Sequence, residues 1–312
     1  MIMTQRKIVI EVPFELDKER LDFFIAKLNP DNSRTFFQRL IKNGAVKLNG
    51  ELCIVPRTAV RARDKIMVEW PETALVPTLL AEDIHLPVIY EDDDLLVIDK
   101  PPGKVVHPGA GNHSGTVVNA LLGRDPSFSA NLPVEGGRPG IVHRLDKDTS
   151  GCMVIAKNSS TLFKLSRAFS EREIDKTYVT LVWGIPKQST GKITNMIGRH
   201  PVKRKKMAEV QRNGKLAISC YEVVKSGTIA ERPASMLAVK IMTGRTHQIR
   251  VHMAGLKLPV IGDKLYGKKN DHVAPRQMLH AWTLAFKHPG SGEQMSFTAP
   301  LPDDFKALEE QL

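Results

Sequence analysis

Hydrophobic residues near the start of the chain recur at helical spacing. Four of them follow the i, i+3, i+4, i+7 rule of an amphipathic helix: Leu21, Phe24, Ile25 and Leu28. Pro30 is expected to end this helix, and Ser33 can cap a second one. The second helix has an apolar face of its own, made of Phe36, Phe37, Leu40 and Ile41. The pattern predicts two short helices in succession.

Alternating apolar and polar residues follow these helices. They alternate over 46–48 and 52–54, and the Asn49-Gly50 pair between them is typical of a type I′ hairpin turn. A further strand is predicted at 66–70. Helix, helix, hairpin and strand in this order predict a small domain over residues 17–75. Residues 76–86 lack periodicity, so we expect a linker that leaves this domain free to move.

Residues 87–312 alternate between strand and helix patterns and predict a second, larger domain. Apolar runs predict strands near 88–90, 95–99, 152–156, 176–183, 217–224, 236–242, 279–282 and 295–298. A helix is predicted at 116–122, and three further helices are predicted after the capping residues Ser159, Thr246 (a helix ended by Gly255) and Asp303. A glycine-rich loop at 103–112 lacks the spacing of a nucleotide-binding loop.

Charge adds a candidate partner. The 312-residue chain has 45 Lys and Arg against 34 Asp and Glu, a formal net charge of +11. This excess favours a polyanion, either nucleic acid or an anionic membrane surface, although a merely basic protein would look the same. Cys53, Cys152 and Cys220 support neither a disulfide framework nor a zinc site. The chain shows no signal peptide and no apolar run of membrane length, which predicts a cytoplasmic protein without membrane contact.

The strongest candidate chemistry lies in the stretch 143–151, His-Arg-Leu-Asp-Lys-Asp-Thr-Ser-Gly. Arg144 and Asp146 are two apart and would share one face of an extended segment. The simpler interpretation is a charged surface turn before a strand. Arg250 lies on a partly apolar helical face, which requires an acidic partner, and Asp146 is our candidate. Asp148, next to a Thr-Ser turn, is expected to accept hydrogen bonds from backbone amides instead.

Basic residues gather in two further places. Arg34, Arg39 and Lys42 decorate the second helix, and residues 198–207 are the densest basic stretch of the chain. Each could be a solvated face, but each also suits a phosphate backbone. His247 and His252 are five residues apart, and no Glu follows the first, so a helical zinc pair is not predicted.

Two resemblances connect these observations. The segments Arg20-Leu-Asp, Ser33-Arg34 and 40–50 resemble an S4 RNA-binding domain. The stretch 140–151, Tyr178 on its strand and the segment 244–252 resemble the RluA-type family of RNA pseudouridine synthases. This likeness implies an α/β (α+β) catalytic domain on a mixed, mostly antiparallel sheet, with no cofactor and no metal. It implies isomerisation of uridine to pseudouridine, which breaks the N1–C1′ bond and joins C5 to C1′.

The family also implies roles for individual residues. Asp146 would be the catalytic carboxylate, Tyr178 would stack on the target base and take part in proton transfer, and Arg250 would pair with Asp146. Arg144 would fill the space left by a flipped uridine, and Leu279 would line the pocket. Base flipping costs a few kcal/mol, which an arginine plane stacked in the gap offsets in part. Further RNA-contacting candidates are His143, His107, His200, Lys203, Arg204, Arg245 and His247, with Arg34, Arg39 and Lys42.

The segments 106–112 and 200–204 are most similar to family members that modify 23S rRNA. This implies uridines of the helix-69 loop as substrate, a pre-50S or 50S particle as partner, and a monomeric enzyme. The loop at 268–276 is shorter than is typical of those members. Two alternatives stay open: a non-catalytic RNA-binding or ribosome assembly factor, and a synthase for other 23S rRNA sites or tRNA. The sequence leaves open whether Asp146 attacks C1′ or C6, or removes a ribose proton.

Overall fold

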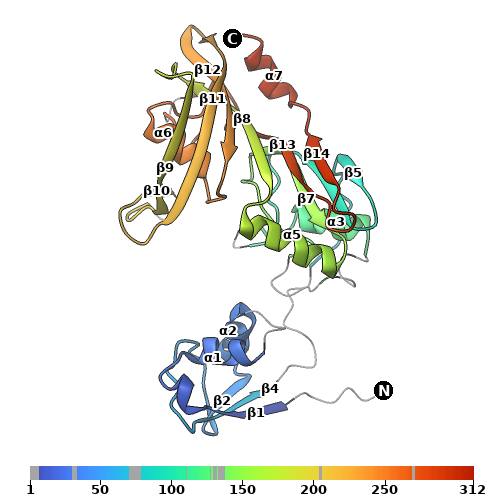
Figure 1. Ribbon diagram of the computed structural model, residues 1–312, viewed down its shortest axis with the longest axis vertical. Helices are drawn as coiled ribbons and strands as arrows, with labels where there is room; N and C mark the ends of the chain where they lie inside the picture. The colour runs from blue at the N-terminus through green and yellow to red at the C-terminus, as the bar shows by residue number, and fades with distance from the viewer. Residues whose placement is uncertain are drawn as a thin grey trace. The chain divides into compact units, whose positions relative to one another are not determined.

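The computed structural model describes residues 7–29, 34–69, 79–109, 111–126, 128, 132, 138–203, 206–268 and 271–312. The described residues divide into two compact units (Figure 1). One consists largely of residues up to Leu79, and the other consists largely of residues from Leu80 onward. Each unit is described by itself.

The first unit pairs two helices with a small antiparallel sheet. Its elements are β1 (Lys7–Glu11), the 3-10 helix η1 (Phe14–Leu16), α1 (Leu21–Leu28), α2 (Arg34–Lys42), β2 (Val46–Leu48), β3 (Glu51–Leu52) and β4 (Lys65–Glu69). The strand order is β1-β4-β2-β3. Both predicted helices and the hairpin are confirmed. Asn49 and Gly50 have φ of 53° and 87°, the left-handed pair that a type I′ turn requires.

The core of the first unit is the predicted apolar face of each helix. Phe24, Ile25, Phe37, Leu40 and Ile41 are fully buried and pack in one cluster with sheet residues. Figure 1 shows both helices on the same side of the sheet. Strand β1, which pairs with β4, was not predicted, and none of its five residues is fully buried. The predicted positions Pro30, Ser33 and Trp70 lie outside the described residues.

The second unit is built on one large sheet. Its strands are β5 (Val88–Glu91), β6 (Leu95–Lys100), β7 (Ser150–Ala156), β8 (Asp175–Trp183), β9 (Thr190–Arg199), β10 (Met207–Glu209), β11 (Lys215–Ile229), β12 (Arg232–Ile241), β13 (Leu279–Lys287) and β14 (Gln294–Thr298). The order is β10-β9-β11-β12-β8-β13-β7-β6-β5, and β14 pairs with β13. Among the described strands only β13 and β7 pair in parallel, so the expected mixed, mostly antiparallel sheet is confirmed.

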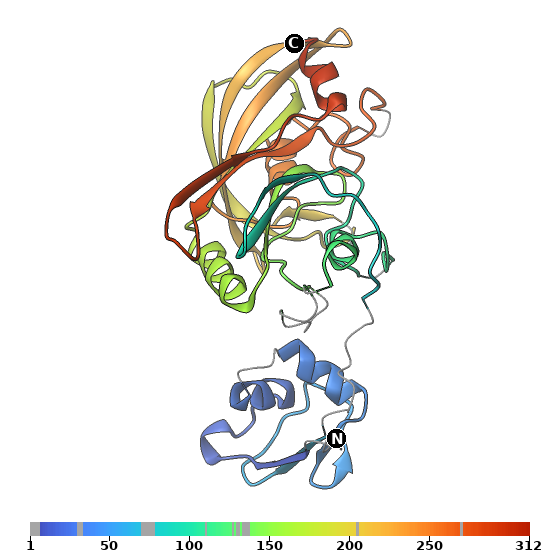
Figure 2. The ribbon, with the colours of Figure 1, turned by 90° about the vertical axis from the view of Figure 1, so that its right-hand side faces the viewer.

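The helices whose bounds the structure describes beside this sheet are α3 (Val117–Arg124), α5 (Ser159–Glu171), α6 (Gln248–Gly255) and α7 (Asp303–Glu309) (Figures 1 and 2). Helix α5 lies against β7, and α6 lies against β10 and β11. Three predicted caps are wrong. Pro302, not Asp303, is the N-cap residue of α7, and Asp303 is its first helical residue. Asn158, not Ser159, caps α5 by accepting from the Thr161 amide. Helix α6 begins after His247, whose φ of 56° is left-handed, so Thr246 is not its cap.

Part of the predicted linker is bonded to the second unit. The Leu80 carbonyl accepts from the Asn119 side chain at 2.8 Å, and the Glu82 carboxylate accepts from the Gly115 amide at 3.0 Å. These bonds tie residues 80–82 to α3 and the turn before it, so any free linker lies before Leu80. No helix in the described ranges is long and apolar enough to cross a membrane.

Candidate active site

A cleft in the second unit collects most of the candidate catalytic residues. It has about 550 Å³ of empty space, part of it open to solvent. Its walls come from the loop before β7, from β8, β12 and β13, and from the start of α6. The lining includes seven of the predicted site residues: Arg144, Asp146, Tyr178, Arg245, His247, Arg250 and Leu279. Segments more than a hundred residues apart in the sequence therefore meet in one place.

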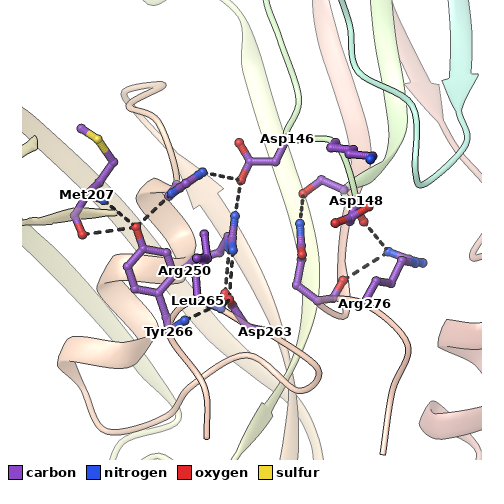
Figure 3. Close-up of polar contacts among 12 residues, drawn as sticks. Asp146, Asp148, Met207, Arg250, Asp263, Leu265, Tyr266 and Arg276 are labelled. Atoms are coloured by element: carbon purple, nitrogen blue, oxygen red, sulfur yellow. Dashed lines mark hydrogen bonds and ion pairs between the residues drawn. The ribbon is translucent and has the colours of Figure 1, made fainter. Parts of the chain in front are cut away.

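Arg250 stands between two carboxylates at the floor of this cleft (Figure 3). Its Nη1 donates to Asp146 Oδ2 at 2.9 Å, so the predicted pair forms. Its Nε and Nη2 donate to the two oxygens of Asp263 at 2.7 and 2.9 Å. The side chains of Arg250 and Asp263 are 5% and 0% exposed, whereas Asp146 is 19% exposed. Asp146 is thus the carboxylate that a substrate can reach.

Asp263 is held in place from its other side. Its Oδ1 accepts from the amides of Leu265 and Tyr266 at 2.8 and 3.0 Å. Burial raises the pKa of this carboxyl, but hydrogen bonds and charge from Arg250 outweigh it, and the net pKa is lowered. Burial lowers the pKa of Arg250, and the two carboxylates more than reverse this. Asp263 and Arg250 are therefore both charged at neutral pH.

Tyr178 also lines the cleft. It lies on β8 and is 9% exposed. Burial raises its pKa well above the ordinary value, and the negative charge of Asp146 raises it further. The phenol is therefore neutral at physiological pH and offers an aromatic face and an O–H group to a bound base. No cluster of three or more potential metal ligands occurs among the described residues.

His247 lines the cleft beside Asp146. Its Nε2 lies 3.8 Å from Asp146 Oδ2, and its Nδ1 is 2.9 Å from the Tyr266 hydroxyl. That hydroxyl also accepts from the Met207 amide at 2.8 Å. Burial lowers the pKa of His247, although Asp146 opposes the effect, so the ring is predominantly neutral at pH 7. A neutral imidazole is thereby fixed beside the candidate catalytic carboxylate.

The turn into α6 owes its shape to one buried glutamine. The Gln248 carboxamide oxygen accepts from the Thr243 hydroxyl at 2.7 Å and from the Arg245 amide at 3.0 Å. Its nitrogen donates to the Ile218 carbonyl at 3.0 Å. Gln248 thus holds the turn before α6 at the Arg245 amide, and it ties the start of α6 to β11. This network fixes the direction in which His247 and Arg250 leave the helix.

A buried lysine supports the loop that bears Asp146. Lys100 Nζ is fully buried and donates to the carbonyls of Pro101, Lys104 and Lys147 at 2.8, 2.9 and 3.0 Å. Burial lowers the pKa of this lysine to about 7, against the opposing charge of Asp148. The loop is also held at the Asp148 carbonyl, which accepts from Arg276 at 3.0 Å (Figure 3). Contrary to expectation, none of the hydrogen bonds among the described residues runs from a backbone amide to the Asp148 carboxylate.

Several predicted RNA contacts lie outside this cleft. His143 accepts from the Val154 amide at 3.0 Å and stacks on Phe169, and burial lowers its pKa to about 3. Its place is structural, although the sequence put it beside Arg144. His200 accepts from the amides of Val202 and Lys203 at 3.1 Å and so shapes the turn between β9 and β10. Lys203 is exposed there, and Arg204 lies outside the described residues. His107 is half-buried in the loop after β6.

The first unit contains a second carboxylate that organises arginines. Asp22 is fully buried and accepts from Arg20 and Arg34, each through Nε at 3.0 Å, and also from Gln38. Burial raises the pKa of Asp22, and these donors outweigh it to give a lowered pKa. Both guanidinium groups stay 48% and 43% exposed. Arg39 is half-buried and Lys42 is exposed on the same helix, so this face can meet an RNA backbone.

Asp263, Tyr266 and Lys100 contribute to the site, although their roles were not predicted from the sequence. A buried arginine requires compensating acid, but the chain has 34 acidic residues, and spacing alone does not select Asp263. The turn Gly262-Asp263 is a usable signal, because Asp after Gly often accepts backbone amides in a tight turn. Lys100 ends an apolar strand, where a lysine is usually a solvated boundary residue.

Sequence comparison agrees with this geometry. Residues 94–255 match the family of RNA pseudouridylate synthases, and residues 19–66 match the S4 domain. An uncharacterized RNA pseudouridine synthase of Aquifex aeolicus is 44% identical, over 96% of this chain and 96% of its own. Ribosomal large subunit pseudouridine synthase D of Pseudomonas aeruginosa is 42% identical, over 95% of this chain and 92% of its own. The one from Vibrio parahaemolyticus is also 42% identical, over 94% and 91%.

A solved structure supports the same conclusion. Human RNA pseudouridylate synthase domain containing 1 is 28% identical with a TM-score of 0.58, and the match covers 70% of this chain and 85% of that one. The chain belongs to the RNA pseudouridylate synthase family, with an S4 domain at its N-terminal side. It is an isomerase that converts uridine in RNA to pseudouridine.

Proposed function

We propose that this enzyme modifies uridines of large-subunit (23S) rRNA, specifically in the helix-69 loop, and that Asp146 is its catalytic carboxylate. The observation that carries the catalytic part is the partly exposed Asp146, paired with a buried Arg250 in a cleft walled by Tyr178. The substrate part rests on the relatives of Pseudomonas and Vibrio, which are named for the large ribosomal subunit. An rRNA target of this kind places the enzyme in the cytoplasm.

The cleft suits a reaction that needs no cofactor. Asp146 accepts from Arg250 through Oδ2, and no hydrogen bond from the described residues reaches Oδ1. Oδ1 is therefore the oxygen available for attack or proton abstraction at the target nucleotide. The bond from N1 to C1′ breaks, C5 joins C1′, and the hydrogen on C5 is exchanged for one on N1. Tyr178 stacks on the base and confines its rotation, and its neutral hydroxyl is in reach for the proton transfers.

Arg144 serves the flipped nucleotide in this proposal. It is exposed at the rim of the cleft and has no ion pair or hydrogen bond within the described ranges. A free guanidinium plane can stack between the neighbours of an extruded base and offset part of the unstacking cost. The S4 domain, proposed over residues 17–75, adds phosphate contacts through Arg20, Arg34 and Lys42. The catalytic domain is proposed over 87–312, with an intervening linker, and the enzyme is proposed to act as a monomer on the 50S particle or its precursor.

The test is a map of pseudouridines in rRNA and tRNA from a strain that lacks the gene. The strain is complemented with the wild-type gene, with the Asp146→Asn variant, or with a control in which surface Glu171 is replaced by Gln. We expect the helix-69 pseudouridines to vanish on deletion and to return with the wild type and the control but not with Asp146→Asn.

Three outcomes would contradict the proposal in different ways. Unchanged helix-69 uridines with losses elsewhere in 23S rRNA or in tRNA would change the substrate. Full restoration by Asp146→Asn would remove the catalytic assignment. Unchanged pseudouridine throughout, with a defect in particle assembly, would favour a non-catalytic assembly role.

A further inference from the structure

Arg250 donates more hydrogen bonds to Asp263 than to Asp146. A guanidinium has five N–H groups in a rigid plane. Nε and Nη2 form a bidentate pair with Asp263 at 2.7 and 2.9 Å, whereas Asp146 receives one bond, from Nη1. A bidentate pair fixes the plane of the guanidinium as well as its position. The direction of the Nη1 bond is therefore set by Asp263.

Asp263 is itself anchored to the backbone. Two amides, of Leu265 and Tyr266, donate to its Oδ1. The preceding Gly262 has φ of 73°, and a Cβ there would lie 2.0 Å from the Arg276 carbonyl oxygen, so only glycine fits. The carboxylate projects from a tight turn that has little freedom to move. Rigid support of this kind is what a side chain needs to hold a neighbour to within a fraction of an ångström.

A second feature is the charge balance among Arg250, Asp146 and Asp263. One guanidinium serves two carboxylates, and Asp263 is fully buried beside it. With Asp263 neutral, the whole attraction of Arg250 would act on Asp146 and hold it more tightly. A carboxylate held in a tight ion pair is a poorer nucleophile and a poorer base than one that shares its cation. The buried acid thus orients the arginine and moderates its hold on the reactive group.

We propose that Asp263 is a positioning residue for pseudouridine formation, which acts through Arg250 to aim Asp146 and to keep it reactive. The proposal rests on the assignment of Asp146 as the catalytic carboxylate. Asp263 itself is too buried to touch RNA. Catalytic groups displaced by about 1 Å can lose on the order of 100-fold in rate. The expected loss of rate on removing Asp263 is of this size, smaller than the loss on removing Asp146.

The test is the single-turnover rate of the Asp263→Asn variant at saturating rRNA. Asparagine keeps an oxygen for the two backbone amides, so the turn is retained. It loses the charge and turns an N–H group toward Arg250. We expect the rate constant to fall roughly 100-fold, with the KM for RNA within about twofold of wild type. A merely structural role would instead reduce the fraction of active enzyme and leave the rate constant of the folded fraction unchanged.

A double-mutant cycle separates action through Arg250 from an independent effect. Lysine at position 250 cannot span both carboxylates, so Asp263→Asn should slow the Arg250→Lys enzyme by less than about threefold, far less than it slows the wild type. The matched control is Asp92→Asn. Asp92 also accepts two backbone amides, at 2.8 Å each, and a side-chain donor, His288, but it lies outside the cleft. Its variant should turn over at the wild-type rate.

Each result bears on one proposal. A wild-type rate for folded Asp263→Asn, together with an inactive Asp146→Asn, overturns the role of Asp263 and leaves the catalytic assignment in place. An active Asp146→Asn removes the assignment itself. If Asp263→Asn fails to fold, Asp263→Glu retains the charge and displaces it by one methylene. A wild-type rate for Asp263→Glu would then overturn the proposal, and a roughly 100-fold loss would support it.

Discussion

Both units of this enzyme use a buried carboxylate to organise arginines, but they expose those arginines differently. In the first unit Asp22 holds Arg20 and Arg34, whose side chains are 48% and 43% exposed. In the second unit Asp263 holds Arg250, which is 5% exposed. The acids are alike, since each is fully buried and each has a lowered pKa despite its burial.

The difference indicates what each arginine is for. Exposed guanidinium groups held by a common acid are preorganised for phosphate, and their contribution should depend on salt. A guanidinium closed off from water interacts strongly with its partners and is screened little by salt. We propose that the first arrangement serves RNA binding and that the second serves the chemical step. Matched variants in the two units test whether the exposed and the buried arginines differ in this way.

The largest expected effect is on stability, from the Arg250→Met variant. Loss of the guanidinium leaves Asp263 buried without its partner, and breaking a buried pair in this way costs about 3–5 kcal/mol. Arg20→Met is the matched change in the first unit, where Asp22 keeps Arg34 and Gln38. It should cost below about 1 kcal/mol, as is usual for an exposed ion pair. Urea unfolding of the full chain measures the free energy of unfolding of both variants. Equal losses in the two variants would contradict the difference between the units.

Lowering the pH should destabilise the two units over different pH ranges. Burial lowers the pKa of His252 and of His280 to about 4 in the second unit. These folded-state pKa values lie below the unfolded value, so each neutral, buried histidine contributes fully to the free energy of unfolding above about pH 6.5. That contribution decreases as pH falls toward 4, by up to about 1.4 kcal/mol per pH unit for each histidine. The first unit has no histidine up to Leu79. The lowered pKa of Asp22 affects its stability only below about pH 4.

Hydrogen exchange of backbone amides between pH 7.5 and 5 would resolve the two units, after correction for the pH dependence of intrinsic exchange. We expect the free energy of opening to decrease in the second unit and to stay level in the first. The His252→Gln variant should show a shallower decrease in the second unit. A decrease of the same slope in both units would show that the buried histidines are not responsible.

The smallest expected effect is on RNA affinity, from replacing Arg20 and Arg34 together by Gln. Two phosphate contacts are lost, so the slope of log K against log salt concentration should decrease by about 1 for each arginine. The KM for rRNA should rise roughly tenfold, while kcat is unchanged. Lys7→Gln, which removes an exposed ion pair with Glu69 at the other side of the sheet, is the control. A fall in kcat with an unchanged salt slope would contradict a binding role.

The fold was predictable wherever one segment carries its own pattern. The helices at 21–28 and 34–42, the Asn49-Gly50 turn and the β8 strand follow local periodicity, and the structure confirms them. The pair of Asp146 and Arg250 was predictable because a buried arginine requires an acid. The pairing of Asp263 with Arg250 was not predictable, since it depends on a turn that lies beside α6 only once the sheet has folded. His143 shows the opposite case, in which a residue adjacent to the site in sequence turns into the core instead.

The central claim is that Asp146 performs the chemistry while other residues bind and position the RNA. The most direct measurement is release of the C5 hydrogen, as tritium from 5-labelled uridine, in a single turnover at saturating large-subunit rRNA. We predict that Asp146→Asn binds this RNA with an affinity within about twofold of wild type and releases tritium at least roughly 10⁴-fold more slowly. Tritium release by Asp146→Asn at a rate close to that of wild type would contradict the account.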